Sequence, residues 1–239
     1  QLVLEQFIEC WAKPYYAYCA QNNLEFTGHY WEHGWPHATH GPDNMAMYAW
    51  MHRPGIDILF NQYSENNGAQ FGNVRSVREL ASVANQLGKN RTLCEAYGGG
   101  GWDLRLEDMK RIGDWMYALG VNTLNEHLSH ITIRGARKTD YPQSFSRHEP
   151  WFESYHLLAD HFTRLSLALT SGEQVHSVLI LEPTTTAWMY QIAFDPSQTE
   201  ALDKVATPFY GLLTRLEAAQ IEYDLGCESI MADHGSVSG

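Results

Sequence analysis

The sequence is poor in the residue types that mark several common classes of protein. Only 18% of its 239 residues are charged, with 16 Lys and Arg against 28 Asp and Glu, and the formal net charge is -12. A nucleic-acid partner would require a basic patch, and no basic run is present, so we expect none. The cysteines show neither CxxC spacing nor a dense framework, which leaves the redox compartment open; they are Cys10, Cys19, Cys94 and Cys227.

Targeting and cofactor signals are also missing. The sequence has no signal peptide and no apolar run long enough to cross a membrane, so we expect no membrane partner. It starts without Met, directly in a helical pattern, and we therefore expect a piece of a longer protein, for which the missing leader says nothing about location. The Gly98–Gly101 run lacks both GxGxxG and the P-loop Lys-Ser/Thr pair, so we expect no nucleotide cofactor.

Aromatic residues, by contrast, are abundant. The chain is 44% hydrophobic and holds 8 Trp, 13 Tyr and 9 Phe, and many of these rings lie next to His or Glu rather than in regular apolar stripes. Flat rings flanked by carboxylates suit sugar rings, although large cores also collect Trp. The pattern favours a globular protein that handles carbohydrate.

Strand and helix patterns alternate along the chain. We predict helices over 2–22 (kinked at Pro14), 42–53, 74–87, 104–119, 151–169 and 200–220, and strands over 24–29, 56–60, 93–95, 121–127, 175–181 and 221–224. We expect the Pro54-Gly55 pair to close the second helix, and Gly88 and Gly120 to end the next two.

The first four strands end at a regular spacing of about 30–35 residues, which is the repeat of a β/α barrel with parallel strands. A closed barrel needs eight units, so we predict an α/β fold in which residues 1–172 form the latter half of a (β/α)8 (TIM-type) barrel. Residues 173–239 open with an apolar strand, a polar loop over 182–186 and a long helix. We predict the start of a second, flavodoxin-like α/β domain there, with a further barrel unit as the alternative.

Three glutamates stand at or just past the C-terminal ends of three of these strands: Glu32, Glu95 and Glu126. Parallel strands place their C-terminal ends at one rim, so we expect the three carboxylates to converge there. Glycoside hydrolysis needs two carboxyl groups with separated pKa values, and a third can hold sugar hydroxyls or a cation such as Ca²⁺. An isolated Glu in such a place could equally cap a helix or form an ion pair.

Aromatic, histidine and amide side chains surround these glutamates and supply stacking surfaces and hydrogen bonds. We predict that the substrate-binding residues are His29, Trp31, His33, Tyr97, Trp102, Asn125, His127 and His130. Histidines also bind zinc, but the spacing from His29 through His33 and His37 to His40 matches no recognised ligand pattern, so no metal ligands are assigned.

Seven short motifs together resemble the α-L-rhamnosidase type of glycoside hydrolase, a group of large, multidomain, mostly bacterial enzymes. They lie in the expected order from the first helix to about Trp188. The motifs are Phe26-Thr27-Gly28-His29, Pro54-Gly55-Ile56-Asp57, Glu95-Ala96-Tyr97-Gly98, Gly101-Trp102-Asp103, Ile112-Gly113-Asp114-Trp115, Leu119-Gly120-Val121-Asn122 and His127-Leu128-Ser129.

The resemblance implies inverting hydrolysis of terminal α-L-rhamnosyl linkages in plant or bacterial polysaccharides, often with Ca²⁺ near the sugar. By analogy Glu32 would be the general acid, Glu126 the general base, and Glu95 a contact to the sugar or metal, although Glu95 could itself belong to the catalytic pair. The resemblance also implies a periplasmic or secreted protein whose remaining chain supplies the missing half of the barrel. Without that half, the piece alone could be inactive.

Two other functions remain open. One is a retaining β-glycosidase of the common barrel clan, in which Glu95 would be the nucleophile. The other is a non-catalytic carbohydrate-binding domain, which would bind sugar without turning it over.

Overall fold

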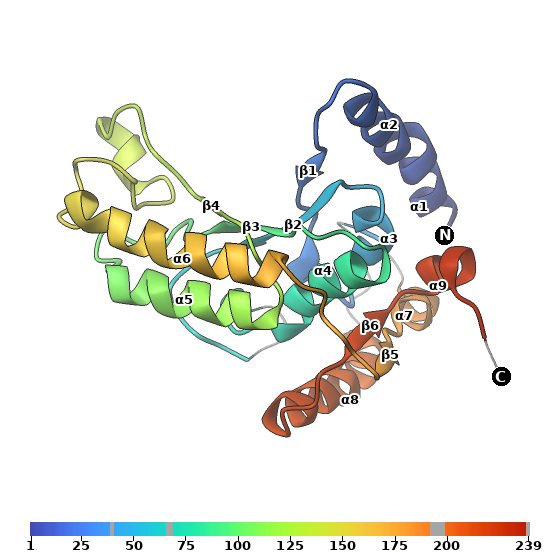
Figure 1. Cartoon of the computed structure of the whole chain (residues 1–239). Coiled ribbons are helices and arrows are strands. Elements are labelled where there is room, and N and C mark those ends of the chain that lie inside the picture. Colours follow the sequence, from blue (N-terminus) through green and yellow to red (C-terminus); the bar gives the residue numbers. More distant parts are fainter. Residues whose placement is uncertain (39–40, 66–68, 192–198, 238–239) are drawn as a thin grey trace.

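The computed structural model describes residues 1–38, 41–65, 69–191 and 199–237 and shows an α/β protein with a curled sheet of parallel strands (Figure 1). Its helices are α1 Leu2–Phe7, α2 Lys13–Gln21, α3 Asn44–Tyr48, α4 Val74–Gln86, α5 Leu106–Leu119, α6 Tyr155–Thr170, α7 Thr184–Tyr190, α8 Thr199–Ala218 and α9 Glu228–His234. Its strands are β1 Thr27–Gly28, β2 Arg53–Ile58, β3 Leu93–Ala96, β4 Leu124–Glu126, β5 Leu179–Leu181 and β6 Asp224–Gly226.

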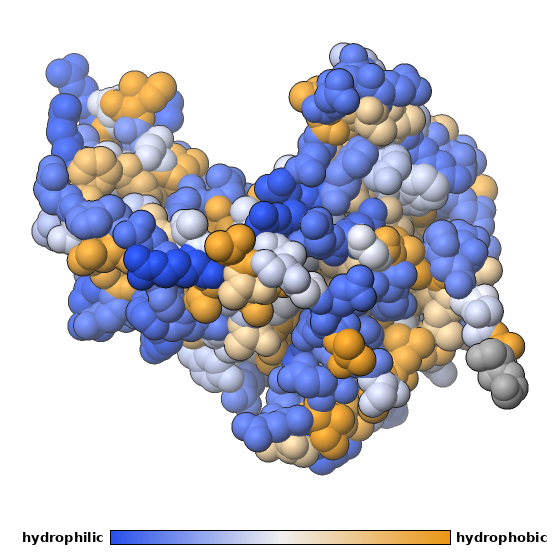
Figure 2. Space-filling view, viewed as in Figure 1, coloured by the Kyte–Doolittle hydropathy of each residue, from blue (hydrophilic) through white to orange (hydrophobic). Residues whose placement is uncertain are grey.

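The first four strands form one parallel sheet in the order β1-β2-β3-β4. Helices α4, α5 and α6 cover one face, below the sheet in the view of Figure 1. The opposite face, which we call the open face, is not covered by helices in this view. Figure 2 shows the surface hollowed above it, between the end that carries α1 and α2 and the segment that follows β4. The predicted arrangement of parallel strands with crossover helices is therefore confirmed.

Most predicted elements are present with shifted ends. A π-helical turn over Ile8–Ala12 joins α1 to α2 in one continuous helical run, and Pro14 is the second residue of α2. The 24–29 strand is reduced to two residues. The expectation for Pro54-Gly55 was wrong: both residues lie inside β2, where Gly55 packs so closely on Gly28 that a Cβ would lie 2.2 Å from the Gly28 carbonyl oxygen.

Helix α4 differs most from its sequence pattern. Asn73 caps it by accepting a hydrogen bond from Ser76 N, as a helix start prefers. Its apolar residues recur at the spacing of an amphipathic helix, yet residues 75–84 are all buried, including Arg75, Arg78 and Glu79. The reason is the second sheet, in which β5 and β6 pair in parallel and β6 packs against α4.

The C-terminal part shares its interior with the rest of the chain. A single hydrophobic cluster joins residues of the first sheet and its helices to Phe209, Leu213 and Tyr223. The polar loop predicted over 182–186 was wrong, because residues 184–190 form helix α7. The boundary between 172 and 173 stays a prediction. Among the described residues, no helix has the length and apolar character that crossing a membrane would require.

Candidate active site

Three polar residues form a row across the open face, one from each of three neighbouring strands. The register pairs Asp57 of β2 with Glu95 of β3, and Glu95 with Asn125 of β4. Paired residues on adjacent parallel strands point to the same side of the sheet, so their side chains emerge together. Asp57 was not among the predicted site residues. The sign of Asp57 in the sequence is a carboxylate between two isoleucines, which are both buried, in a strand that is otherwise typical of a core.

Glu32 lies beside this row in a short 3₁₀ turn after β1, over Glu32–Gly34, and is completely buried. Its Oε1 accepts a 2.5 Å hydrogen bond from Asp57 N, and its Oε2 accepts one of 3.4 Å from the Tyr48 hydroxyl. The buried Arg75 guanidinium donates to the Glu32 carbonyl oxygen and holds the turn from the α4 side.

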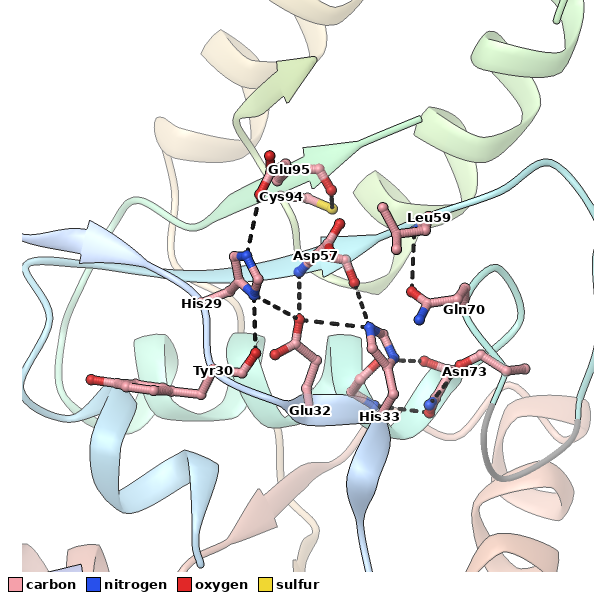
Figure 3. A network of polar contacts seen from close by, with 12 residues as sticks. His29, Tyr30, Glu32, His33, Asp57, Leu59, Gln70, Asn73, Cys94 and Glu95 are labelled. Carbon is pink, nitrogen blue, oxygen red and sulfur yellow. Dashed lines mark hydrogen bonds and ion pairs between the residues drawn. The ribbon is translucent and has the colours of Figure 1, made fainter. Parts of the chain in front are cut away.

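His29 connects Glu32 to the row (Figure 3). Its Nδ1 is 3.8 Å from Glu32 Oε1, and its Nε2 is 3.2 Å from Glu95 Oε2, so the imidazole stands between the two carboxyl groups. His33 lies on the other side, where its Nε2 donates a 2.8 Å hydrogen bond to the Asp57 carbonyl oxygen. Two histidines therefore hold three carboxyl-bearing residues in one polar network.

Burial shifts the proton affinities of this network. It raises the pKa of Glu32 to about 7, against the lowering effect of the Asp57 N–H and His29. Burial, together with the charge of Glu95, raises the pKa of Asp57 to about 6 although His29 opposes the shift. Burial lowers the pKa of His33 to about 4, so this imidazole stays neutral near pH 7. For His29, burial lowers the pKa, but Glu32 and its other acceptors outweigh it and the net shift is upward.

Glu126 does not join the other glutamates. It pairs with Ala96, not with Glu95, and so points to the opposite face of the sheet. There it accepts a hydrogen bond from the Tyr155 hydroxyl of α6. The expected convergence of three glutamates was therefore wrong, because the register places Glu126 one residue out of line. The open face instead brings together Glu32, Asp57 and Glu95.

The predicted substrate-binding residues are divided in the same way. Tyr97 is fully buried, and its hydroxyl donates to the Met109 carbonyl of α5, so it is a core residue and not part of the open face. Trp102 is partly exposed, and its Nε1 donates to the Lys138 carbonyl oxygen. Trp31, in the loop before Glu32, is about half exposed.

The remaining predicted binding residues follow the ends of the strands. Asn125 is exposed on the open face beside Glu95. The His127 ring packs against Gly98, where an added Cβ would lie 2.9 Å from its Cγ, so a side chain at position 98 would displace it. His130 is anchored through its backbone N–H, which donates to the Ser144 hydroxyl.

Comparison with known families decides what this site belongs to. A glycoside hydrolase family model described as alpha-L-rhamnosidase matches residues 6–199, which include the whole open face. The chain belongs to this α-L-rhamnosidase family.

A solved structure shows the same fold. It is the rhamnosidase from Novosphingobium sp. PP1Y, which matches 70% of this chain with a TM-score of 0.55 and 23% sequence identity. The matched part is 16% of that much longer chain, so the chain spans a small share of this structural relative. No curated protein matches the chain significantly.

One group of side chains in this member of the rhamnosidase family has the spacing of a metal site. His29, Asp57 and Glu95 each offer a ligand atom, and these atoms lie within 4.8 Å of one another. Asp57 Oδ1 is buried and makes no hydrogen bond to any described residue, which leaves one carboxylate oxygen available. Calcium prefers oxygen ligands, so the two carboxylates fit it, whereas the imidazole fits it poorly.

Proposed function

We propose that the open face is the catalytic site of an α-L-rhamnosidase that hydrolyses terminal α-L-rhamnosyl linkages in plant or bacterial polysaccharides. Family membership supports the reaction class. The open face adds a hollow surface, beside which burial raises the pKa of the Glu32 carboxyl group as a general acid requires. The substrate would be carbohydrate.

The observation that carries this proposal is the burial of Glu32. With a pKa of about 7, its carboxyl group is protonated below about pH 7 and then has a proton to donate to the departing oxygen. Glu95 lies across the His29 ring from it and is partly exposed, so it is open to water. We assign Glu32 as the general acid and Glu95 as the general base in place of Glu126.

The assignment implies an inverting reaction. An inverting pair keeps its carboxyl groups about 6.5–9.5 Å apart to admit a water molecule. Glu32 and Glu95 are likewise held apart, since they lie on either side of the His29 imidazole. The ligand oxygens of Asp57 and Glu95 lie within 4.8 Å of each other. Two carboxylates this close are better placed to hold a sugar hydroxyl or a cation than to leave room for the attacking water of an inverting reaction.

A calcium ion is part of the proposal. Asp57 and Glu95 would hold it through their carboxylates, and it would bind and orient sugar hydroxyls. His29 would keep its contact with Glu95. If removal of calcium with EDTA leaves the rate of hydrolysis unchanged, Glu95 acts as a base alone.

The architecture proposed for the chain follows from the repeat of its parallel units. Four such units would be the latter half of an eight-unit barrel, and β5, α8 and β6 would begin a flavodoxin-like domain. A crystal structure of the full-length gene product tests this, because the missing strands should continue the sheet at β1 and β4.

Hydrolysis of an aryl α-L-rhamnoside by the full-length gene product is the direct test. Glu32→Gln and Glu95→Gln should each lower kcat/KM by about 10²–10⁴-fold, the usual contribution of a positioned proton-transfer group. Asp57→Asn should also lower kcat/KM, because it weakens the proposed site for calcium and sugar hydroxyls. Glu126→Gln is the matched control and should keep kcat/KM within about threefold of wild type, because its side chain lies on the opposite face. Full activity in all three open-face variants would refute the assignment.

Two further measurements separate the alternative functions. Proton NMR of the first sugar formed shows β-L-rhamnose for inversion and α-L-rhamnose for a retaining reaction with Glu95 as nucleophile. Calorimetry detects a protein that binds rhamnosides without hydrolysing them, as a carbohydrate-binding domain would.

A further inference from the structure

Two aromatic rings form an exposed pair, one from Phe60 just after β2 and one from Tyr141 in the segment between β4 and α6. The rings of Phe60 and Tyr141 lie 6.5 Å apart between centroids and are inclined by only 22°, so they are nearly parallel. Their residues are 43% and 48% exposed. We call this pair the aromatic platform. Large apolar rings left half in water have unused binding surface.

The backbone holds this platform in an unfavourable conformation. Phe60 has φ 64° and Tyr141 has φ 47°, in the left-handed region that bulky side chains seldom adopt. Gly99, with φ 68°, lies under both rings, and a Cβ there would be 2.9 Å from Phe60 Cε1 and 3.2 Å from Tyr141 Cδ1. Strain of this kind costs free energy and gathers at functional sites. Packing of the core does not account for it, because both rings are exposed.

The platform lies just beyond the proposed catalytic row. Phe60 N donates a 2.9 Å hydrogen bond to the Gly98 carbonyl oxygen, and these two residues lie three positions beyond the paired Asp57 and Glu95. At about 3.3 Å per residue, the platform is up to about 10 Å further along the strand direction. The ring of His127, which follows β4, is 6.0 Å from that of Tyr141.

We propose that the aromatic platform binds the leaving group of the substrate, as a second sugar ring or an aryl ring stacked on Phe60 and Tyr141. This inference rests on the proposed rhamnosidase function. A leaving group that extends along the strand direction from a rhamnosyl unit bound at Asp57 and Glu95 would reach these two rings. The C–H face of a pyranose and the face of an aryl ring both pack on such rings.

The test compares substrates that differ only in the leaving group, using the full-length gene product. Phe60→Leu and Tyr141→Leu remove a flat face but keep apolar volume, while Phe60→Tyr and Tyr141→Phe keep the ring. Aryl α-L-rhamnosides and rhamnosyl disaccharides should lose about three- to tenfold in kcat/KM with each Leu variant, as expected for one aromatic contact. Methyl α-L-rhamnoside has a leaving group without a ring, so its kcat/KM should change less than twofold.

Controls keep the outcome interpretable. Phe60→Tyr and Tyr141→Phe keep the rings and should therefore keep the wild-type kcat/KM. Tyr18→Leu, at an exposed aromatic on α2, should leave kcat/KM unchanged for every substrate. Equal losses on all three substrates, including the methyl glycoside, would overturn the proposal, because the rings would then serve the rhamnosyl unit or the fold. No loss on any substrate would overturn it as well. A wild-type protein that hydrolyses no rhamnoside refutes the proposed function itself, and this inference with it.

Discussion

Replacing Glu32 by Gln should remove the loss of stability that the folded protein undergoes as pH rises. The carboxyl group is completely buried, and burial raises its pKa from 4.5 to about 7. Between these two values the folded chain holds a proton that the unfolded chain has released, so stability falls as pH rises through this window. A shift of this size corresponds to roughly 3 kcal/mol, reached in full above about pH 7.

The Gln variant presents the same shape without the titration. Its side-chain oxygen can still accept from Asp57 N, so at pH 4.5 the variant should match wild type closely. At pH 8 it should be more stable, by up to about 3 kcal/mol. Urea unfolding followed by tryptophan fluorescence at the two pH values measures the difference.

Tyr48→Phe is the matched control for this experiment. It removes the hydroxyl that donates to Glu32 but keeps the carboxyl group, so the loss of stability toward pH 8 should persist. If Glu32→Gln gains nothing at pH 8 over pH 4.5, then Glu32 is ionised in the folded protein and cannot serve as the proposed acid.

Three other predictions concern the pH profile of hydrolysis, the Arg75–Glu79 ion pair and the packing of α5 on α6. In wild-type protein kcat/KM should fall about tenfold per pH unit above about pH 7, as Glu32 loses its proton, and a flat profile to pH 9 would contradict its role. Arg75→Met leaves Glu79 buried without the guanidinium that lies 2.6 Å from it, and should lower the free energy of unfolding by about 3–5 kcal/mol in urea titrations. Gly113→Ala would bring a methyl group to 2.1 Å from Phe162 Cζ between α5 and α6, and should cost about 1–3 kcal/mol by the same assay. A variant at position 113 as stable as wild type would show that these helices have room to separate.

Local sequence patterns were sufficient to predict most of the helices and strands. Apolar spacing and a terminal glycine predicted α4 and α5 to within a few residues, because a helix needs only its own hydrogen bonds and its caps. The alternation of strands with helices predicted the parallel sheet, since parallel neighbours require crossover connections. The position of Glu95 at the end of a buried strand was visible in the same way.

Which side of the sheet a residue faces was not available from local patterns. Glu95 and Glu126 each follow an apolar strand, yet pairing of Ala96 with Glu126 sends them to opposite faces. Register is a property of two strands together, and a shift of one residue reverses the face of every side chain. Asp57 was overlooked for the same reason. It is a lone carboxylate among isoleucines, and only its pairing with Glu95 on the neighbouring strand makes it part of the site.

The sequence by itself determined the order and kind of most strands and helices, and the motifs of the rhamnosidase family. Only the tertiary structure decided the composition of the site and the burial of α4 by the second sheet. The physical reason is range: helix caps and apolar periods act within a few residues. The proton affinity of Glu32 arises from the water excluded by Tyr48, Asp57 and Arg75, which packing brings from elsewhere in the chain.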